Sequence, residues 1–276
     1  QQTYDVRNID LAVEVPIEID VILVSGVEDS ISVEEIENLE LFIQRGGNIF
    51  IGQSRIKTDL QTQNAEGIQS NIFDFLNQYG LGVRENLVLD LQCGQISVLQ
   101  NRGIFRMQTA VEYPFFPLIR NFADDQIVVK GLEQVRTLFP SELWAYEDTT
   151  GSVEEIESSF TPLLYTSERS GSMEQFFSLN PVQNPAFSTL NEEGKVVAAL
   201  SNIVVSEEGV SSQILLVGDS KFLSDDAGGG IPENTIFVLN SVDYLMGDSE
   251  LISIRSREIT TRPLKDNIAD TAKKNW

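Results

Sequence analysis

The residues best placed to do chemistry lie in Gly218-Asp219-Ser220, directly after the apolar run Ile214–Val217. An apolar run that ends in small polar residues indicates a buried strand opening into a loop. Together with Asp225, Asp219 could supply the paired carboxylates of a hydrolase or glycosidase that uses no histidine. With Asp226, the same carboxylates could collect a divalent cation, but their spacing is not that of a calcium loop. We therefore predict neither a metal nor a cofactor.

The composition excludes most other catalytic chemistry. The chain contains no histidine among its 276 residues, so Ser-His-Asp and Cys-His catalysis and histidine-ligated zinc cannot be built from it. A Gly-Lys-Ser/Thr phosphate loop is also absent. The single cysteine, Cys93, cannot form a disulfide within the chain, and we interpret it as a half-buried structural residue. We predict that the protein is not an enzyme.

The charge restricts the partners. The chain carries 42 acidic and 19 basic residues, a formal net charge of −23. Such a charge repels phosphate backbones and anionic lipid headgroups, so we expect no nucleic-acid partner. No apolar run reaches the roughly 20 residues of a membrane span. We expect partners that are neutral, cationic or proteins.

The elements that would position the candidate residues alternate between strand and helix. Ser32 and Glu35 form the sequence pattern of a capping box at the start of a helix, and Gly46-Gly47 ends that helix. An alternation of strands and helices predicts a parallel sheet. The predicted strands are Asp20–Ser25, Asn48–Gly52 and Gln213–Gly218, and the predicted helices are Ser32–Arg45, Ser70–Tyr79 and Asn234–Met246.

We therefore predict an α/β fold with a flavodoxin-like or Rossmann-like parallel sheet flanked by helices. In such a sheet the carboxyl ends of the strands share one edge, which is the usual crevice for ligands. Small residues with hydroxyls and free amides there could hold a neutral glycan or a peptide backbone. The alternative is that short polar loops are simply what a strand-to-helix turn requires. The candidate ligand-binding residues are Ser25, Gly26, Gly52, Gln53, Ser54, Asp219 and Ser220.

The middle of the chain changes to short strand-like runs separated by glycine, proline and acidic turns. We predict a β-rich insertion of residues 84–209 packed against a parallel α/β core of residues 1–83 and 210–262. Within the insertion, the proline-rich and aromatic Tyr113–Ile119 is predicted to be a rigid loop packed under its own rings, with an exposed recognition surface as the alternative. The predicted strands are Leu87–Asp90, Gln95–Leu99, Ile104–Gln108, Gln126–Lys130, Val135–Phe139 and Phe160–Tyr165.

The ordered set of segments resembles the auxiliary subunits of ABC transporters typified by GldG of the gliding-motility machinery. Each segment is common alone, but their order is more specific and spans nearly the whole chain. The resemblance extends in core fold to a domain of intraflagellar-transport proteins. The segments that carry it are Val15-Pro16, Asp20–Leu23, Ser32–Ile49, Leu76–Leu81, Asn86–Asp90, Tyr113–Ile119, Pro162–Ser167 and Gln213–Asp226 with Asn234–Asp248 and Leu251–Glu258.

The resemblance implies a non-catalytic, extracytoplasmic domain of a membrane-anchored protein, which binds or scaffolds within a transport or gliding-motility complex. The implied partners are the permease and ATPase subunits and other envelope proteins, and the implied location is the bacterial inner membrane with the domain facing the periplasm or exterior. The tail of residues 263–276 would lead toward a membrane segment, since Lys273, Lys274 and Trp276 are typical of a bilayer interface. The residues alone leave open the histidine-independent hydrolase or glycosidase on a flavodoxin-like core.

Overall fold

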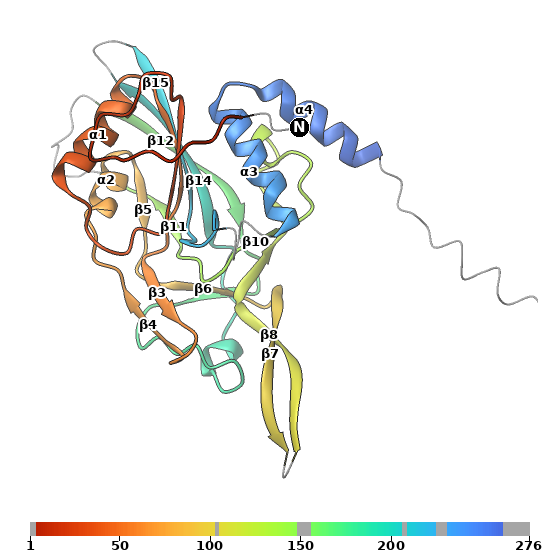
Figure 1. The fold of residues 1–276 in the computed structure, drawn as a ribbon. Coiled ribbons are helices and arrows are strands. Elements are labelled where there is room, and N and C mark those ends of the chain that lie inside the picture. The colour runs from red at the N-terminus through yellow and green to blue at the C-terminus, as the bar shows by residue number, and fades with distance from the viewer. Residues whose placement is uncertain (1–3, 103–104, 148–155, 206–208, 225–230, 262–276) are drawn as a thin grey trace, which may run out of the picture.

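The computed structural model describes residues 4–102, 105–147, 156–205, 209–224 and 231–261. Within them the largest element is a six-stranded mixed sheet in the order β1-β2-β15-β14-β12-β9. Figure 1 shows helices on both sides of this sheet and a long hairpin that leaves the body at the end opposite α4. The six strands are β1 (Val21–Ser25), β2 (Asn48–Gly52), β15 (Val210–Val217), β14 (Val196–Val205), β12 (Ile156–Tyr165) and β9 (Asn121–Phe122).

The predicted flavodoxin-like or Rossmann-like class is wrong. β1, β2 and β15 are paired in parallel, as predicted, but β14, β12 and β9 are added on the far side of β15 in antiparallel pairs. β14 and β15 follow each other in the chain with a short connection, and such a connection joins antiparallel strands. The result is a β-rich protein with a mixed sheet, in which the long strands β12 and β14 of the predicted insertion belong to the main sheet.

Both faces of the sheet are covered by helices. α1 (Val33–Gln44) and α2 (Ile72–Gln78) cover one face in a core that includes Phe42, Ile49 and Ile214. α3 (Pro232–Leu245) covers the other face, where the rings of Phe50 and Phe237 lie 6.4 Å apart. These helices lie where they are predicted, with ends that differ by one to two residues.

The capping box of α1 is confirmed. The Ser32 hydroxyl accepts a hydrogen bond from the Glu35 amide at 3.2 Å, and the Glu35 carboxylate accepts one from the Ser32 amide at 2.7 Å. Two amides that the first helical turn leaves without partners are thereby satisfied.

Two predictions for the middle of the chain are wrong. Gln126–Lys130 is not a strand, since it contains the short 3₁₀ helix η1 (Ile127–Val129). Tyr113–Ile119 is not a loop, since it forms the end of strand β8 (Phe105–Ile119). Prolines are tolerated there because the pairing of β8 with β7 (Cys93–Arg102) shifts register between Cys93 and Gln95, so that not every amide is needed.

The rings of this segment are packed as predicted, with Tyr113 and Phe116 at 5.0 Å and Phe115 and Phe139 at 5.8 Å. Four smaller sheets complete the fold, in the orders β10-β8-β7, β11-β5, β13-β6 and β3-β4. The remaining elements are β3 (Ile56–Asp59), β4 (Asn64–Gly67), β5 (Leu81–Val83), β6 (Leu87–Asp90), β10 (Val135–Arg136), β11 (Leu143–Ala145), β13 (Ser170–Met173), η2 (Pro185–Ser188) and α4 (Ser249–Thr261).

A buried polar network on α3 joins the first and last described segments. Arg255 of α4 donates to Asp243 and to Asn240, each at 2.5 Å, and the Tyr4 hydroxyl donates to the other carboxylate oxygen of Asp243. The two described ends of the chain therefore meet at one corner of the body (Figure 1). Within the described residues no helix combines the length and the apolar character needed to cross a membrane. The predicted tail of residues 263–276 lies outside them.

Candidate functional site

The structure brings the predicted strand-end residues together. The Ser25 hydroxyl donates to the Ser220 carbonyl at 2.8 Å, and the Ser220 hydroxyl accepts from the Ser54 amide at 2.8 Å. The hydroxyls of Ser54 and Ser220 lie 2.9 Å apart. Loops that follow β1, β2 and β15 are thus bonded directly to one another.

The two glycines allow these loops to approach closely. Gly26 has a φ of +67°, and its amide donates to the Gly52 carbonyl at 3.1 Å. A Cβ atom on Gly52 would lie 3.0 Å from the Asp219 carbonyl oxygen, which is closer than ordinary contact. A larger residue at either position would separate the loops or strain the backbone.

Gln53 and Asp219 are fully buried and bonded to backbone groups. The side-chain amide of Gln53 accepts a hydrogen bond from the Val27 amide and donates one to the Val27 carbonyl, both at 2.8 Å. It also donates to the Ser54 carbonyl. The Asp219 carboxylate accepts from the amides of Leu138 at 2.7 Å and Lys221 at 2.8 Å. Burial raises the pKa of Asp219 to about 7, against the opposing effects of these two hydrogen bonds and the Lys221 charge.

The strand-end edge is therefore a closed junction in which the polar groups of the loops are hydrogen-bonded to one another. That arrangement matches the alternative interpretation, in which the short polar loops are a requirement of the turns; ligand binding by these residues stays a prediction. Asp225 and Asp226, the possible partners of Asp219 in a carboxylate pair or cation site, lie outside the described residues. Across the described residues, no three acidic or cysteine side chains are grouped to hold a metal ion.

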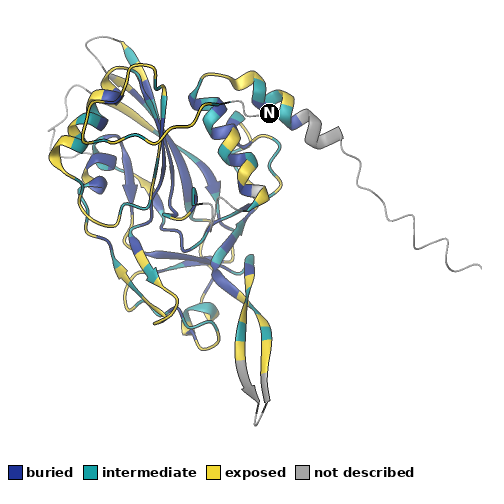
Figure 2. Cartoon of the chain, viewed as in Figure 1, coloured by how far each residue is buried: buried dark blue, intermediate teal, exposed yellow. Residues whose placement is uncertain are grey.

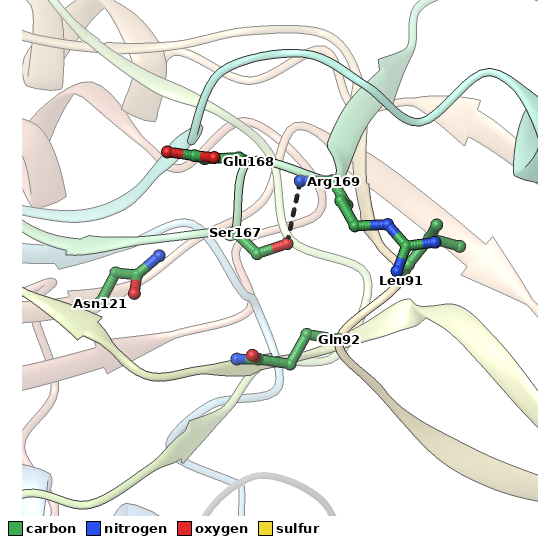
Figure 3. A pocket seen from close by; sticks show the side chains of 6 residues that line it. All are labelled: Leu91, Gln92, Asn121, Ser167, Glu168 and Arg169. Carbon is green, nitrogen blue, oxygen red and sulfur yellow. Dashed lines mark hydrogen bonds between the residues drawn. The ribbon is translucent and has the colours of Figure 1, made fainter.

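A polar pocket of about 470 Å³ lies farther along the same edge of the main sheet, beyond β14, where β6 ends and the β12–β13 turn passes over it. Figure 3 shows Glu168 and Arg169 on one side of this pocket and Gln92 on the other. We call it the Asp90 pocket, after the buried carboxylate that organises it. Its lining residues are Leu91, Gln92, Asn121, Ser167, Glu168 and Arg169.

Asp90 holds the two sides of the pocket together. Its carboxylate accepts from the Ser167 amide at 2.6 Å, the Ser167 hydroxyl at 2.7 Å and the Gln92 amide at 2.7 Å. Asn86–Asp90 and Pro162–Ser167 both belong to the segments that carry the family resemblance, and their ends meet here. The sequence analysis names no candidate ligand-binding residue at this pocket, although a polar residue directly after an apolar run was a usable signal in both segments.

The pocket offers unpaired polar groups. Gln92 donates to the Leu118 carbonyl at 2.5 Å and Asn121 donates to the Thr166 carbonyl at 3.0 Å, which orients both amides and leaves their oxygens without a donor among the described residues. The exposed side chains of Glu168 and Arg169 have no ion-pair partner there either. Acceptors and a guanidinium therefore line the pocket with hydrogen-bonding capacity that the described residues leave unused.

The described residues show no activated nucleophile at either place. The Ser167 hydroxyl donates to a carboxylate, accepts from the Arg169 amide at 3.1 Å, and has no imidazole or amine beside it. Burial raises the pKa of the Cys93 thiol to about 11, so the thiolate is scarce near neutral pH. Cys93 is half-buried, as predicted. The arrangement suits binding rather than covalent catalysis.

Comparisons with known proteins identify the family of the chain. A family profile described as "ABC-type uncharacterized transport system" matches residues 1–245. A protein of Borreliella burgdorferi, described as an uncharacterized protein, is 26% identical over 275 residues, which cover 94% of this chain and 52% of that protein. The chain thus spans about half the length of this relative. The solved mmIFT52 N-terminal domain is similar with a TM-score of 0.49 and 14% identity, over 83% of this chain and 78% of that one.

Proposed function

Because this chain belongs to the family of auxiliary components of an ABC-type transport system, we propose that it is a non-catalytic, extracytoplasmic domain that docks within the transport complex. Its partners in this proposal are the permease and ATPase subunits or other envelope proteins. The full-length protein is anchored in the bacterial inner membrane, with this domain facing the periplasm or exterior. A role in gliding motility is the narrower form of the same proposal.

The observation that carries the proposal is the Asp90 pocket. Two segments that are 77 residues apart meet there through a buried carboxylate, and they present oriented amides and an unpaired acid and base. A rigid base with open hydrogen-bonding groups is what a docking site requires. We place the docking role at this pocket, with the strand-end junction as the frame that fixes the loops of the main sheet.

The corner at Asp243 supports the proposed anchoring. Tyr4 and Arg255 bind the same carboxylate, so that the first and last described segments meet at this corner. A membrane attachment through either segment would hold the body by this corner. The β7–β8 hairpin would then point away from the membrane (Figure 1).

Thiol labelling tests the proposed side of the membrane. The full-length protein carries Cys93→Ser to remove the native thiol and Ser30→Cys to place one at an exposed turn. We expect an impermeant thiol reagent to modify this cysteine in intact cells whose outer membrane, if present, is permeabilised. Modification only after lysis, with an outward control cysteine modified in the same cells, would place the domain in the cytoplasm and contradict the proposal.

Copurification tests the proposed docking. Glu168→Ala combined with Arg169→Ala should reduce recovery of the permease and ATPase with the full-length protein by about tenfold, if the pocket supplies the contact. The matched control is Glu28→Ala with Lys57→Ala, which removes a surface ion pair of 2.6 Å that contributes little. Equal losses for both pairs of substitutions, or a loss for neither, would remove the pocket from the interface.

A further inference from the structure

A pocket of about 440 Å³ lies at the edge of the main sheet opposite the strand-end junction. Residues at the start of the parallel strands β2 and β15 line it, together with the end of the antiparallel strand β14. The last turn of α3 and the exposed Gly247 form its other side. We call it the Tyr244 pocket. Its volume is within the range of small-molecule sites, and Figure 2 shows α3 beside the sheet whose edge it occupies.

Hydrogen bonds fix the walls of the Tyr244 pocket. The Asn48 side chain donates to the Leu245 carbonyl and accepts from the Gln213 backbone amide, both at 2.7 Å, which joins the end of α3 to β2 and β15. The Gln213 side chain donates to the Asn202 side-chain oxygen at 2.8 Å and to the Tyr244 hydroxyl at 3.2 Å. The polar side chains are therefore oriented before any ligand arrives, as a specific site requires.

This frame leaves an acceptor and a donor next to each other. Both hydrogen bonds of the Gln213 side chain are donated by Nε2, so Oε1 accepts from no group among the described residues. The Tyr244 hydroxyl accepts from the same Nε2 and donates to no described group, which leaves its proton available. Because Nε2 and Oε1 belong to one amide, the free acceptor lies close to the free donor. A ligand group that donates and accepts at once would complete both.

The Tyr244 pocket is uncharged. None of the described residues that line it is charged, although charged residues make up 22% of the chain. The pocket also lies at the carboxyl end of α3, where the last carbonyls of the helix carry a partial negative charge. An anion would be repelled there, and a cation would meet no carboxylate in the lining. The pocket therefore favours a neutral ligand.

We propose that the Tyr244 pocket binds an uncharged ligand through a primary amide or a hydroxyl group. Either group can donate to Gln213 Oε1 and accept from the Tyr244 hydroxyl, whereas a carboxylate has no proton to donate. A site that hydrogen-bonds its ligand in this way discriminates against analogues that lack the donor. The proposal does not depend on docking at the Asp90 pocket, which lies at the opposite edge of the sheet.

A nuclear magnetic resonance titration of the 276-residue chain tests the proposal. The probes are acetyl-glycyl-glycinamide for the amide and glucose for the hydroxyl, which are similar in size. We expect at least one probe to shift the Gln213 side-chain signals and the Gly247 amide signal saturably, with a dissociation constant of about 1 to 10 mM. Acetyl-glycyl-glycine has a carboxylate in place of the terminal amide and should bind about tenfold more weakly or not at all. The probe that binds identifies the group.

Substitutions assign the binding to the free donor and acceptor. Tyr244→Phe removes the donor and keeps the ring, and Gln213→Leu removes the acceptor; each should weaken binding by about fivefold or more. The matched control, Tyr146→Phe, removes the hydroxyl of a partly exposed tyrosine outside the pocket and should leave the dissociation constant within about twofold. No saturable shift with either probe up to about 50 mM would overturn the proposal. Equal affinity for the carboxylate probe, or binding that Tyr244→Phe leaves unchanged, would also overturn it.

Discussion

The buried carboxyl of Asp219 should make the stability of the protein depend on pH in a direction opposite to the usual one for an aspartate. Burial raises the pKa of Asp219 to about 7 in the folded state, from an ordinary value of 3.8. The folded protein therefore keeps a proton at this carboxyl over a range in which the unfolded chain has lost it. In this pH range proton binding by Asp219 favours the folded state. The contribution of Asp219 to the free energy of unfolding is therefore complete below about pH 4 and is lost as the pH rises through about 7.

The size of the effect follows from the shift. Each pKa unit corresponds to about 1.4 kcal/mol, so the contribution of Asp219 falls by up to about 4 kcal/mol between about pH 4 and pH 8. Asp219→Asn removes this titration. It also places an NH₂ group against the amide of Leu138 or Lys221, which costs about 1 to 3 kcal/mol at every pH because one donor loses its acceptor.

Denaturant unfolding of both proteins across this pH range measures the difference directly, and other titrating groups cancel. At about pH 4 the wild type should be more stable than Asp219→Asn by about 1 to 3 kcal/mol, and by about pH 8 the order should reverse. A difference that stays constant within about 0.5 kcal/mol, or that increases with pH in favour of the wild type, would refute the reasoning.

Three further substitutions test other parts of the structure, each by the free energy of unfolding. Ser32→Ala removes the capping hydrogen bond of α1 and should cost about 1 kcal/mol, with Ser30→Ala as a control near zero. Arg255→Leu leaves the buried carboxylate of Asp243 without its cation and should cost about 3 kcal/mol, whereas Asp243→Asn should cost less because Arg255, 24% exposed, can reach water. Asp90→Asn deprives the Ser167 or Gln92 amide of an acceptor and should cost about 2 kcal/mol, against about 1 for Ser167→Ala. Equal losses within either of the last two pairs would contradict the assigned partners.

The local elements of this fold follow from the sequence where short-range chemistry decides them. Ser32 and Glu35 define the start of α1 because both partners lie within one turn. The apolar runs of β1, β2 and β15 end in glycine or serine, and these strands are parallel as the intervening helix predicts. The overall class could not be obtained this way, because the neighbours of β12 and β14 are chosen by packing between distant segments. The continuous apolar run Val196–Leu200 was the available sign of a central strand.

The strand-end junction and the Asp90 pocket differ in how far each could be predicted from local sequence. The strand-end residues could be grouped from sequence because parallel strands share one edge, and Ser25, Ser54 and Ser220 are indeed bonded together. The Asp90 pocket depends on one contact between Asp90 and Ser167, whose 77-residue separation no local pattern bridges. Hydrogen-bond partners at such distances follow from the fold. The prediction of a loop at Tyr113–Ile119 failed because local proline signals were stronger than the aromatic packing that extends β8.

Photocrosslinking from the Asp90 pocket in living cells tests most directly whether this domain docks within an ABC transport complex. A photoreactive phenylalanine derivative replaces Glu168 in the full-length protein, and a control replaces Gln61, in the exposed turn between β3 and β4. We predict a covalent adduct with the permease, the ATPase or another envelope protein from position 168 and none from position 61. No adduct from position 168, or the same adducts from both positions, would contradict the proposed docking.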